Sequence, residues 1–209
     1  MKTQANKEIP LKEIIDFLES DLIDVKGNIS KKRIRYLKPI EEVDEYTLDW
    51  VSRLKNNKQE LAESSIAKAI IVDSNVTYTD VIKNADKVLI YVNNPKAIIS
   101  KIGHHFFTKK IKPGIHPSAC IDEEAEIGKD VFIGPFCTIG KCVIGNNTII
   151  HSNVSIYDNV SIGNNCLIHS GAVIGTDGLG CERSENGTLI KFPHLGGVII
   201  GNDIEIGAN

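Results

Sequence analysis

The second half of the chain is dominated by a six-residue repeat in which isoleucine opens every unit. From Ile115 onward, eleven consecutive units begin with Ile, and one of them, IGKCV, is shortened to five residues. The fifth position of each unit holds a small or β-branched residue: Ala119, Ala125, Val131, Cys137, Val143, Thr148, Val154, Val160, Cys166, Ala172 and Gly178. Each unit therefore has two inward positions, one for a large side chain and one for a small side chain. Because these positions recur every six residues, the repeat constrains the fold more than any other feature of the sequence.

A six-residue period with this inward pattern is typical of a triangular coil. Each unit forms one short strand and one corner, three units make a turn of about 18 residues, and turns stack about 4.8 Å apart. Gly, Asn and Asp at the second to fourth positions suit corners, where the backbone adopts positive φ. The sequence therefore predicts an all-β parallel β-helix over residues 113–209.

Residues 1–112 lack the repeat and have the mixed pattern of a small α/β domain. We expect an amphipathic helix at 10–20, buried strands at 67–72 and 87–92, and a helix at 93–107 that starts with Pro95 after Asn94. KKIKPG, residues 109–114, is the expected joint. The predicted fold class is thus an α+β N-terminal domain followed by the β-helix.

Composition excludes several classes of protein. The balance of 24 Lys and Arg against 27 Asp and Glu is too even to indicate binding to nucleic acid or to an anionic membrane surface. The longest apolar runs, AIIV and VLIYV, are far short of the roughly 20 residues of a membrane span, so we expect a soluble, cytoplasmic protein. The five cysteines show no ligand spacing, which favours reduced thiols over disulfides or a metal site.

The repeat breaks after Ile174 into a polar excursion, residues 175–197, and resumes at Ile200. Such an excursion either shapes a ligand cleft, clasps a neighbouring subunit, or is a tolerated surface loop. The stretches HSGAVIGTDGLG, KFPHLGGVIIG and IEIGAN resemble the signature of the UDP-3-O-acylglucosamine N-acyltransferases of lipid A biosynthesis, which are hexapeptide-repeat acyltransferases. The chain departs from this signature at Leu179 and Cys181, where the family usually has aromatic residues, and at His194, where it often has Gln.

The resemblance carries several implications. It implies a left-handed coil, a homotrimer and no cofactor or metal. It also implies transfer of a 3-hydroxyacyl chain from acyl carrier protein to the amine of a UDP-sugar, with residues 1–112 as a nucleotide-binding-like domain. The loop would line the substrate cleft through Asp177, Gly178, Lys191 and His194.

One segment of the first domain is matched to the family's uracil site. A stretch of the type Leu-Ser-Phe-x-x-Asn-Pro-Lys-Tyr holds uracil between two aromatic rings in the family, and LDWVSRLKNN corresponds to it here. This alignment places Trp50 at the first ring, Arg53 at the amide and Asn56 at the second ring. A Trp face stacks on a flat base and Arg contacts phosphate or base. The alternative is that Trp50 is simply a large core residue.

The histidines offer candidates for a catalytic base. Acyl transfer to an amine needs a base of near-neutral pKa. His116, His151 and His169 share the second slot of their units, so His151 and His169 should stack one turn apart. His116 would lie about 10 Å from His151, too far to share a zinc ion within one chain. A zinc site at a subunit interface and packing of the rings at a trimer contact both remain open.

In the family the catalytic His follows an Ile-Asp-Arg-Gly type segment that comes after Ile-Gly-Ala-Asn. This chain stops at Asn209, so the resemblance implies that it is C-terminally incomplete and lacks this His. No catalytic residue is therefore assigned. Two alternative functions are a related sugar acetyl- or acyltransferase for surface polysaccharide, and a non-catalytic short paralogue that binds nucleotide-sugar.

Overall fold

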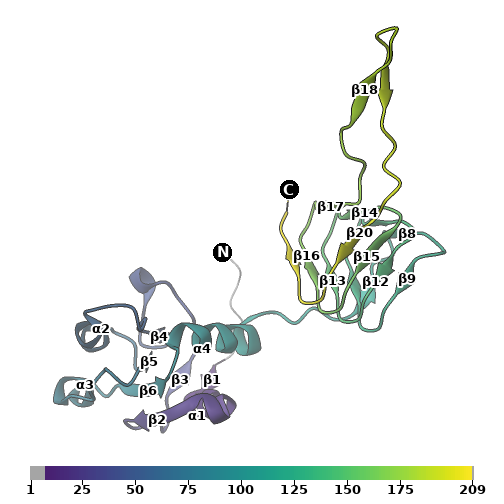
Figure 1. The fold of residues 1–209 in the computed structure, drawn as a ribbon. Coiled ribbons are helices and arrows are strands. Elements are labelled where there is room, and N and C mark those ends of the chain that lie inside the picture. The colour runs from purple at the N-terminus through teal and green to yellow at the C-terminus, as the bar shows by residue number, and fades with distance from the viewer. Residues whose placement is uncertain (1–7, 209) are drawn as a thin grey trace. The chain divides into compact units, whose positions relative to one another are not determined.

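The structure is a computed structural model that describes residues 8–208. The chain divides into two compact units, Met1–Lys109 and Lys110–Asn209 (Figure 1). Within the described part of the chain, no helix is long and apolar enough to cross a bilayer.

The N-terminal unit is built on a mixed four-stranded sheet of order β2-β6-β5-β4, in which β2 runs antiparallel to β6 and the other pairs are parallel. A separate antiparallel pair joins β1 and β3. The strands are β1 (Ile9–Pro10), β2 (Leu22–Lys26), β3 (Arg33–Ile34), β4 (Leu48–Trp50), β5 (Ala69–Val72) and β6 (Val88–Val92). The helices are α1 (Leu11–Leu18), α2 (Lys58–Ser64), α3 (Asp80–Asn84) and α4 (Pro95–Ile102), with short 3-10 turns at Glu19–Asp21 and Ile40–Glu42.

Successive residues of the central strands face opposite sides of the sheet and are buried on both. Ala69 and Ile71 of β5 pack in one cluster with the apolar faces of α1 and α4. Ile70 and Val72 pack in a second cluster with Ala62 of α2 and with α3. Because both faces are covered, β5 and β6 read in the sequence as continuous apolar runs, not as alternating ones. The expected strands at 67–72 and 87–92 are found.

Helix α4 begins where the sequence predicts. The Asn94 side chain accepts a hydrogen bond from the Ala97 N–H, and Pro95 occupies the first turn, where its missing N–H costs nothing. After Ile102 the helix widens into a π-helical turn, Gly103–Phe107. The ring of His105 in this turn stacks on Phe17 of α1, with centroids 4.3 Å apart.

The C-terminal unit is a parallel β-helix, as the repeat predicts. Three parallel sheets stack along it, with orders β7-β10-β13-β16-β21, β8-β11-β14-β17 and β9-β12-β15-β20 (Figure 1). The strands of the first two sheets are β7 (Gly114–Ile115), β10 (Phe132–Ile133), β13 (Ile149–Ile150), β16 (Leu167–Ile168) and β21 (Glu205–Ile206), then β8 (Cys120–Ile121), β11 (Thr138–Ile139), β14 (Ser155–Ile156) and β17 (Val173–Ile174). The third sheet has β9 (Glu126–Ile127), β12 (Val143–Ile144), β15 (Val160–Ile162) and β20 (Val198–Ile200).

The repeat isoleucines from Ile121 to Ile174 point inward and form a single stacked core, whereas Ile115 of the first unit is 52% exposed. Ile133, Ile150 and Ile168 lie in register on neighbouring strands and are fully buried. Two of the expected fifth-position inward residues were wrong. In the five-residue unit IGKCV the buried side chain is Cys142, whereas Val143 is exposed, because the missing residue shifts the inward slot by one. Gly178 is exposed in the loop and does not belong to the coil.

Asparagine ladders fix one corner of the coil. The side-chain oxygens of Asn146, Asn164 and Asn202 each accept a backbone N–H from the coil below, from Lys129, Asn146 and Asn164 respectively, at 2.7–2.8 Å. At other corner positions the backbone adopts positive φ, at Asp130, Phe136, Asn147, Asn153, Asn159, Asn165 and Asp203. Asn and Asp tolerate this region best, which explains their recurrence in the repeat.

Candidate functional site

A cavity of about 550 Å³ opens in the N-terminal unit beside the end of β4. It is lined by residues from segments 38–43, 49–55 and 61–66. Trp50, the last residue of β4, is half-buried, packs against the core and also lines the cavity. Pairing of β4 with β5 in parallel holds Trp50 opposite Ile71. Trp50 is therefore a partly buried core residue that also lines the cavity, and its stacking on uracil stays a prediction.

The polar groups of this cavity are largely paired within the protein. One carboxylate oxygen of Asp49 accepts the Ser65 hydroxyl at 2.5 Å, and the other accepts the Trp50 N–H at 2.8 Å. The Lys38 ammonium pairs with Asp44. Burial raises the pKa of Asp44, but hydrogen bonds from Lys38 and a neighbouring threonine outweigh it, so the pKa lies below its ordinary value. The Lys38–Asp44 pair therefore stays charged near neutral pH.

The other two residues matched to the uracil segment lie elsewhere. Arg53 and Asn56 are exposed and do not line the cavity. A tight turn intervenes, because the Lys55 N–H donates to the Ser52 carbonyl and the following residues run away on the surface. Ser52 and Lys55 line the cavity instead, and no periodic pattern in the sequence marks them.

The inserted loop, residues 175–197, projects from the coil as a β-hairpin of β18 (Cys181–Arg183) and β19 (Leu189–Lys191) (Figure 1). Glycines stand where it leaves and rejoins the coil. A Cβ on Gly175 would lie 2.5 Å from Cγ2 of Val160, and one on Gly197 would lie 2.0 Å from the Asn159 carbonyl oxygen. Gly175 also has φ of 87°, so larger residues are excluded at this end on two grounds.

The four loop residues singled out in the sequence meet at the base of the hairpin. The Lys191 ammonium lies 2.6 Å from the Asp177 carboxylate. The hydrogen bond from Lys191 lowers the pKa of Asp177, and the same bond raises the pKa of Lys191. A Cβ on Gly178 would lie 2.9 Å from Nε2 of His194, so these two segments touch. The arrangement offers a carboxylate, an ammonium and an imidazole together.

The predicted stacking of histidines on the coil is found. The rings of His151 and His169 lie 5.6 Å apart and nearly parallel. Nε2 of His169 is 2.6 Å from a carboxylate oxygen of Glu205, and Nδ1 of His116 is 2.9 Å from the Ser118 hydroxyl. Glu205 was missed from the sequence because the loop separates it from His169 by 36 residues. Among residues 8–208, no three His, Cys, Asp or Glu side chains group closely enough to hold a metal ion.

Comparison with known proteins gives the class of the C-terminal unit. The family model described as bacterial transferase hexapeptide (six repeats) matches residues 141–176. This match and the three parallel sheets fit a β-helix built from hexapeptide repeats in the C-terminal unit.

Curated relatives are more specific. UDP-3-O-acylglucosamine N-acyltransferase 1 of Legionella pneumophila (strain Paris) is 37% identical over 83% of this chain and 52% of its own length. The protein of the same name from Francisella tularensis subsp. holarctica (strain OSU18) is 35% identical over 95% of this chain and 62% of its own. The predicted resemblance to the UDP-3-O-acylglucosamine N-acyltransferases is therefore confirmed. The chain spans between half and two thirds of the length of these relatives.

A solved Arabidopsis UDP-N-acetylglucosamine acyltransferase is 31% identical over 46% of this chain and 28% of its own, with a TM-score of 0.36. A TM-score this low does not define a fold.

Proposed function

We propose that the protein is an N-acyltransferase that moves a 3-hydroxyacyl chain from acyl carrier protein to the amine of a UDP-3-O-acylglucosamine in lipid A biosynthesis. The observation that carries the proposal is the sequence identity of 35–37% to relatives of this name, which match 83–95% of this chain. The segments GTDGLG and KFPHLGG between Ile174 and Ile200 support it, because they resemble the signature of this family.

The proposal divides the work between the two parts of the chain. Residues 1–112 hold the nucleotide, and residues 113–209 form a left-handed coil whose loop, 175–197, lines the acyl-acceptor cleft. In this proposal Asp177, Lys191 and His194 contact the sugar or its phosphates, and their meeting at the hairpin base supports the role. Attack of an amine on a thioester releases a proton, which a general base must accept. No residue of this chain is assigned that role.

The assembly and location belong to the same proposal. We place the protein in the cytoplasm as a homotrimer without metal or cofactor. The five cysteines, none paired with another, support a reducing compartment. Apolar side chains on the outer face of the first coil sheet, from Phe132, Ile149 and Leu167, give a surface on which a second copy can pack.

The direct test is product formation. The purified chain is incubated with a 3-hydroxyacyl–acyl carrier protein and UDP-3-O-acylglucosamine, and the product is followed by mass spectrometry. The proposal expects an N-acylated product with this chain or with a longer form of the same protein, and the product's acyl length gives the donor. Transfer of acetyl from coenzyme A to another sugar would instead support the surface-polysaccharide acyltransferase.

Binding is tested separately through the single Trp. If uracil stacks on Trp50, a UDP-sugar quenches its fluorescence, and Trp50→Ala weakens binding by about 1–3 kcal/mol, the range for base–aromatic stacking. Binding is compared by calorimetry, because the variant has lost its fluorophore. Undiminished binding to Trp50→Ala would remove the ring from the nucleotide site.

A further inference from the structure

Three consecutive cations, Lys31, Lys32 and Arg33, border two further hollows on the N-terminal unit. The larger hollow has a volume of about 350 Å³ and is also lined by Lys12, and among the described residues no carboxylate lines it. The smaller one has a volume of about 210 Å³. Of the residues that line these two hollows, none also lines the cavity beside Trp50. The cations therefore belong to a separate feature of this unit.

Hydrogen bonds fix the backbone that carries these cations. Strand β3 begins at Arg33 and pairs antiparallel with β1. The Leu11 N–H donates to the Lys32 carbonyl at 2.9 Å, which brings the first turn of α1, with Lys12, to the same hollow. Lys31 has a φ of 66°, a conformation that few residues other than glycine adopt. Cations from a turn, a strand and a helix thus meet at one place.

Two of the cations have carboxylate partners. The Lys32 ammonium lies 2.6 Å from Asp86, and the hydrogen bond from Lys32 lowers the pKa of that carboxyl, so the pair stays charged near neutral pH. Nε of Arg33 lies 3.8 Å from one oxygen of Glu8, whose other oxygen pairs with Arg35. One carboxylate therefore serves two guanidinium groups, and positive charge is left over.

The other cations add to this excess. Among residues 8–208, the ammonium groups of Lys12 and Lys31 form no ion pair. Lys68, which lines the smaller hollow, donates to the Ala85 carbonyl at 2.8 Å. Burial lowers the pKa of Lys87, and the nearby Lys68 ammonium lowers it further. Because the whole chain has a formal net charge of −3, the positive charge here is a local feature.

We propose that the larger hollow binds a phosphate monoester, with the Arg33 guanidinium on two of its oxygens and the Lys12 and Lys31 ammonium groups neutralising its charge. A monoester carries about −1.5 to −2 charges at pH 7, which suits several cations around one group. The planar fork of Arg matches two phosphate oxygens, whereas Lys acts as a mobile point charge. The Ser30 hydroxyl lines the same hollow and can donate a further hydrogen bond.

The lining also limits what the phosphate is attached to. Among the described residues no aromatic ring lines the larger hollow, so a nucleobase has no ring to stack on. Its volume is at the low end for small-molecule sites. The ligand is therefore a small phosphorylated group, either free in solution or the headgroup of a lipid. This inference does not use the proposed function, because it concerns other residues and another ligand.

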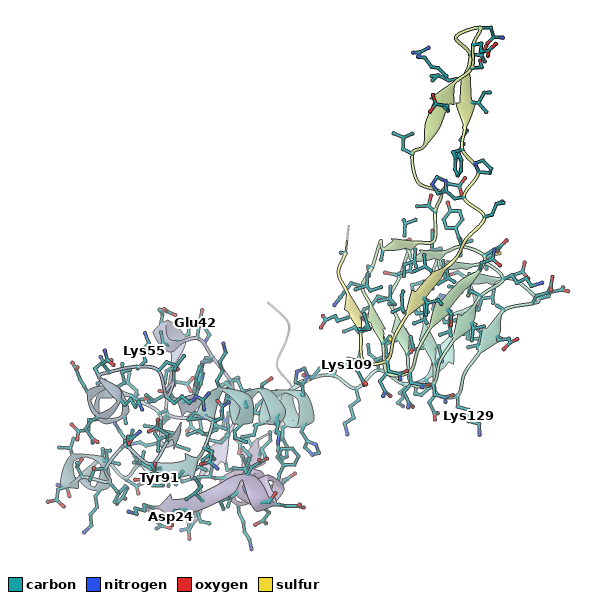
Figure 2. The ribbon with its side chains drawn as sticks, in the orientation of Figure 1. Asp24, Glu42, Lys55, Tyr91, Lys109 and Lys129 are labelled. Carbon is teal, nitrogen blue, oxygen red and sulfur yellow. The ribbon has the colours of Figure 1, made fainter. Side chains whose placement is uncertain are left out.

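The experiment titrates the full chain with glycerol 3-phosphate at constant ionic strength and follows binding by calorimetry. The variants are Lys31→Gln, Arg33→Gln and Arg33→Lys, at two exposed residues. Lys129→Gln is the matched control, since Lys129, labelled on the coil unit in Figure 2, is also exposed and lines neither hollow. Thermal unfolding checks that each variant folds.

We expect Lys31→Gln and Arg33→Gln each to weaken binding at least about fivefold, through the lost charge-assisted hydrogen bonds. Arg33→Lys should restore only part of the affinity, because an ammonium group does not bridge two oxygens as the guanidinium fork does. Lys129→Gln should stay within about 1.5-fold. An excess of uridine should also leave the affinity unchanged, because the hollow shares no lining residue with the cavity beside Trp50.

Vesicles distinguish the two sources of the phosphate. Phosphatidylcholine vesicles containing phosphatidic acid present a monoester, whereas phosphatidylglycerol vesicles of matched surface charge present a diester. Sedimentation of the chain with the first kind alone, lost in Arg33→Gln, assigns the hollow to a lipid headgroup. Binding of glycerol 3-phosphate without sedimentation on either kind assigns it to a soluble phosphate.

Three results overturn the inference, and none of them bears on product formation by the proposed transferase. The first is that neither glycerol 3-phosphate nor phosphatidic acid binds the wild-type chain. The second is that Lys129→Gln weakens binding as much as Arg33→Gln, or that both vesicle kinds bind every variant equally, which would mean attraction by overall charge. The third is displacement of glycerol 3-phosphate by uridine, which would place the phosphate in the cavity beside Trp50.

Discussion

The two units reach a buried core by opposite routes. In the coil the same packing contact recurs in every turn. Each turn places an isoleucine against the isoleucines of the turns above and below it, as at Ile133, Ile150 and Ile168. In the N-terminal unit each core residue has its own surroundings, and the sheet separates two clusters. Repetition makes a regular stack of turns, whereas the irregular packing of the N-terminal unit leaves the cavity of about 550 Å³ beside Trp50. The comparison teaches that a repeated sequence pattern specifies the scaffold, while non-repeated packing shapes the cavity.

Cysteine thiols and the Trp fluorophore lie in different units, so each unit can be followed separately. All five cysteines lie in the coil unit and the single Trp lies in the other. Cys137, Cys142 and Cys166 are buried, whereas Cys120 and Cys181 are exposed. Burial raises the pKa of Cys142 to about 11, which further reduces its reactive thiolate.

The largest expected effect is therefore in thiol labelling. At pH 8 two thiols should react with a maleimide at once, and three should react at least about 10³-fold more slowly, because the coil must open first. Mass spectrometry of digests assigns the sites, and labelling in denaturant should reach all five. Rapid labelling of Cys142 in the native chain would contradict the closed stack.

The second effect compares one core residue from each unit. Ile150→Ala and Ile71→Ala both remove a fully buried side chain, so each should lower the free energy of unfolding by about 2–5 kcal/mol. Denaturant titrations followed by circular dichroism and by Trp50 fluorescence measure it. Ile199→Ala, on the outer face of β20 and 87% exposed, should change stability by less than about 0.5 kcal/mol.

If Ile150→Ala shifts the Trp50 transition as much as Ile71→Ala does, the two units unfold together. If Ile150→Ala shifts only the dichroism transition, each unit responds to its own core. A change below 1 kcal/mol at both positions would mean that neither core carries the stability assigned to it.

A third, smaller effect concerns the corner ladder. Asn164 accepts the Asn146 N–H at 2.8 Å, and Asn164→Ala removes that acceptor. Water can reach this exposed corner, so the loss should be about 1 kcal/mol of unfolding free energy. Ser161→Ala, on the same coil, is the control and should be neutral. If Asn164→Ala and Ser161→Ala change the free energy of unfolding equally, the asparagine ladder makes no specific contribution to stability.

The smallest effect is a pH dependence of the loop. Lys191 lowers the pKa of Asp177, so the stabilisation is present above the unfolded pKa of Asp, near 4, and is lost as pH falls through the lower folded value. The raised pKa of Lys191 preserves the pair at alkaline pH until its folded value is passed. Amide exchange of residues 175–197 should therefore be constant between pH 5 and 9, after correction for intrinsic rates. Exchange should rise below about pH 4, and Asp177→Asn should abolish that rise.

The same contrast decides what could be predicted from the sequence. The coil, its buried isoleucines, the stacked histidines and the break at Ile174 follow from counting, because register repeats. The six-residue count predicts the wrong inward residue in the five-residue unit, where Cys142 is buried in place of Val143. It also misses the contact between His169 and Glu205, because the loop lies between these two residues in the sequence. The cavity wall could not be predicted, since Ile40 and Ile66 join Trp50 only through tertiary packing. Arg53 and Asn56 were placed by linear alignment, which takes no account of the turn at Ser52.

The place where the loop joins the coil has an evolutionary consequence. The loop stands where a corner would link β17 to β20, and the coil below makes the same link with Tyr157, Asp158 and Asn159. Lengthening a corner to residues 175–197 costs only about 1.5 kcal/mol of chain-closure entropy. Since Gly175 and Gly197 fix both ends against the coil below, the residues between them can be exchanged as a cassette. A segment of different length and sequence can then replace it, with no change to the stack that carries it.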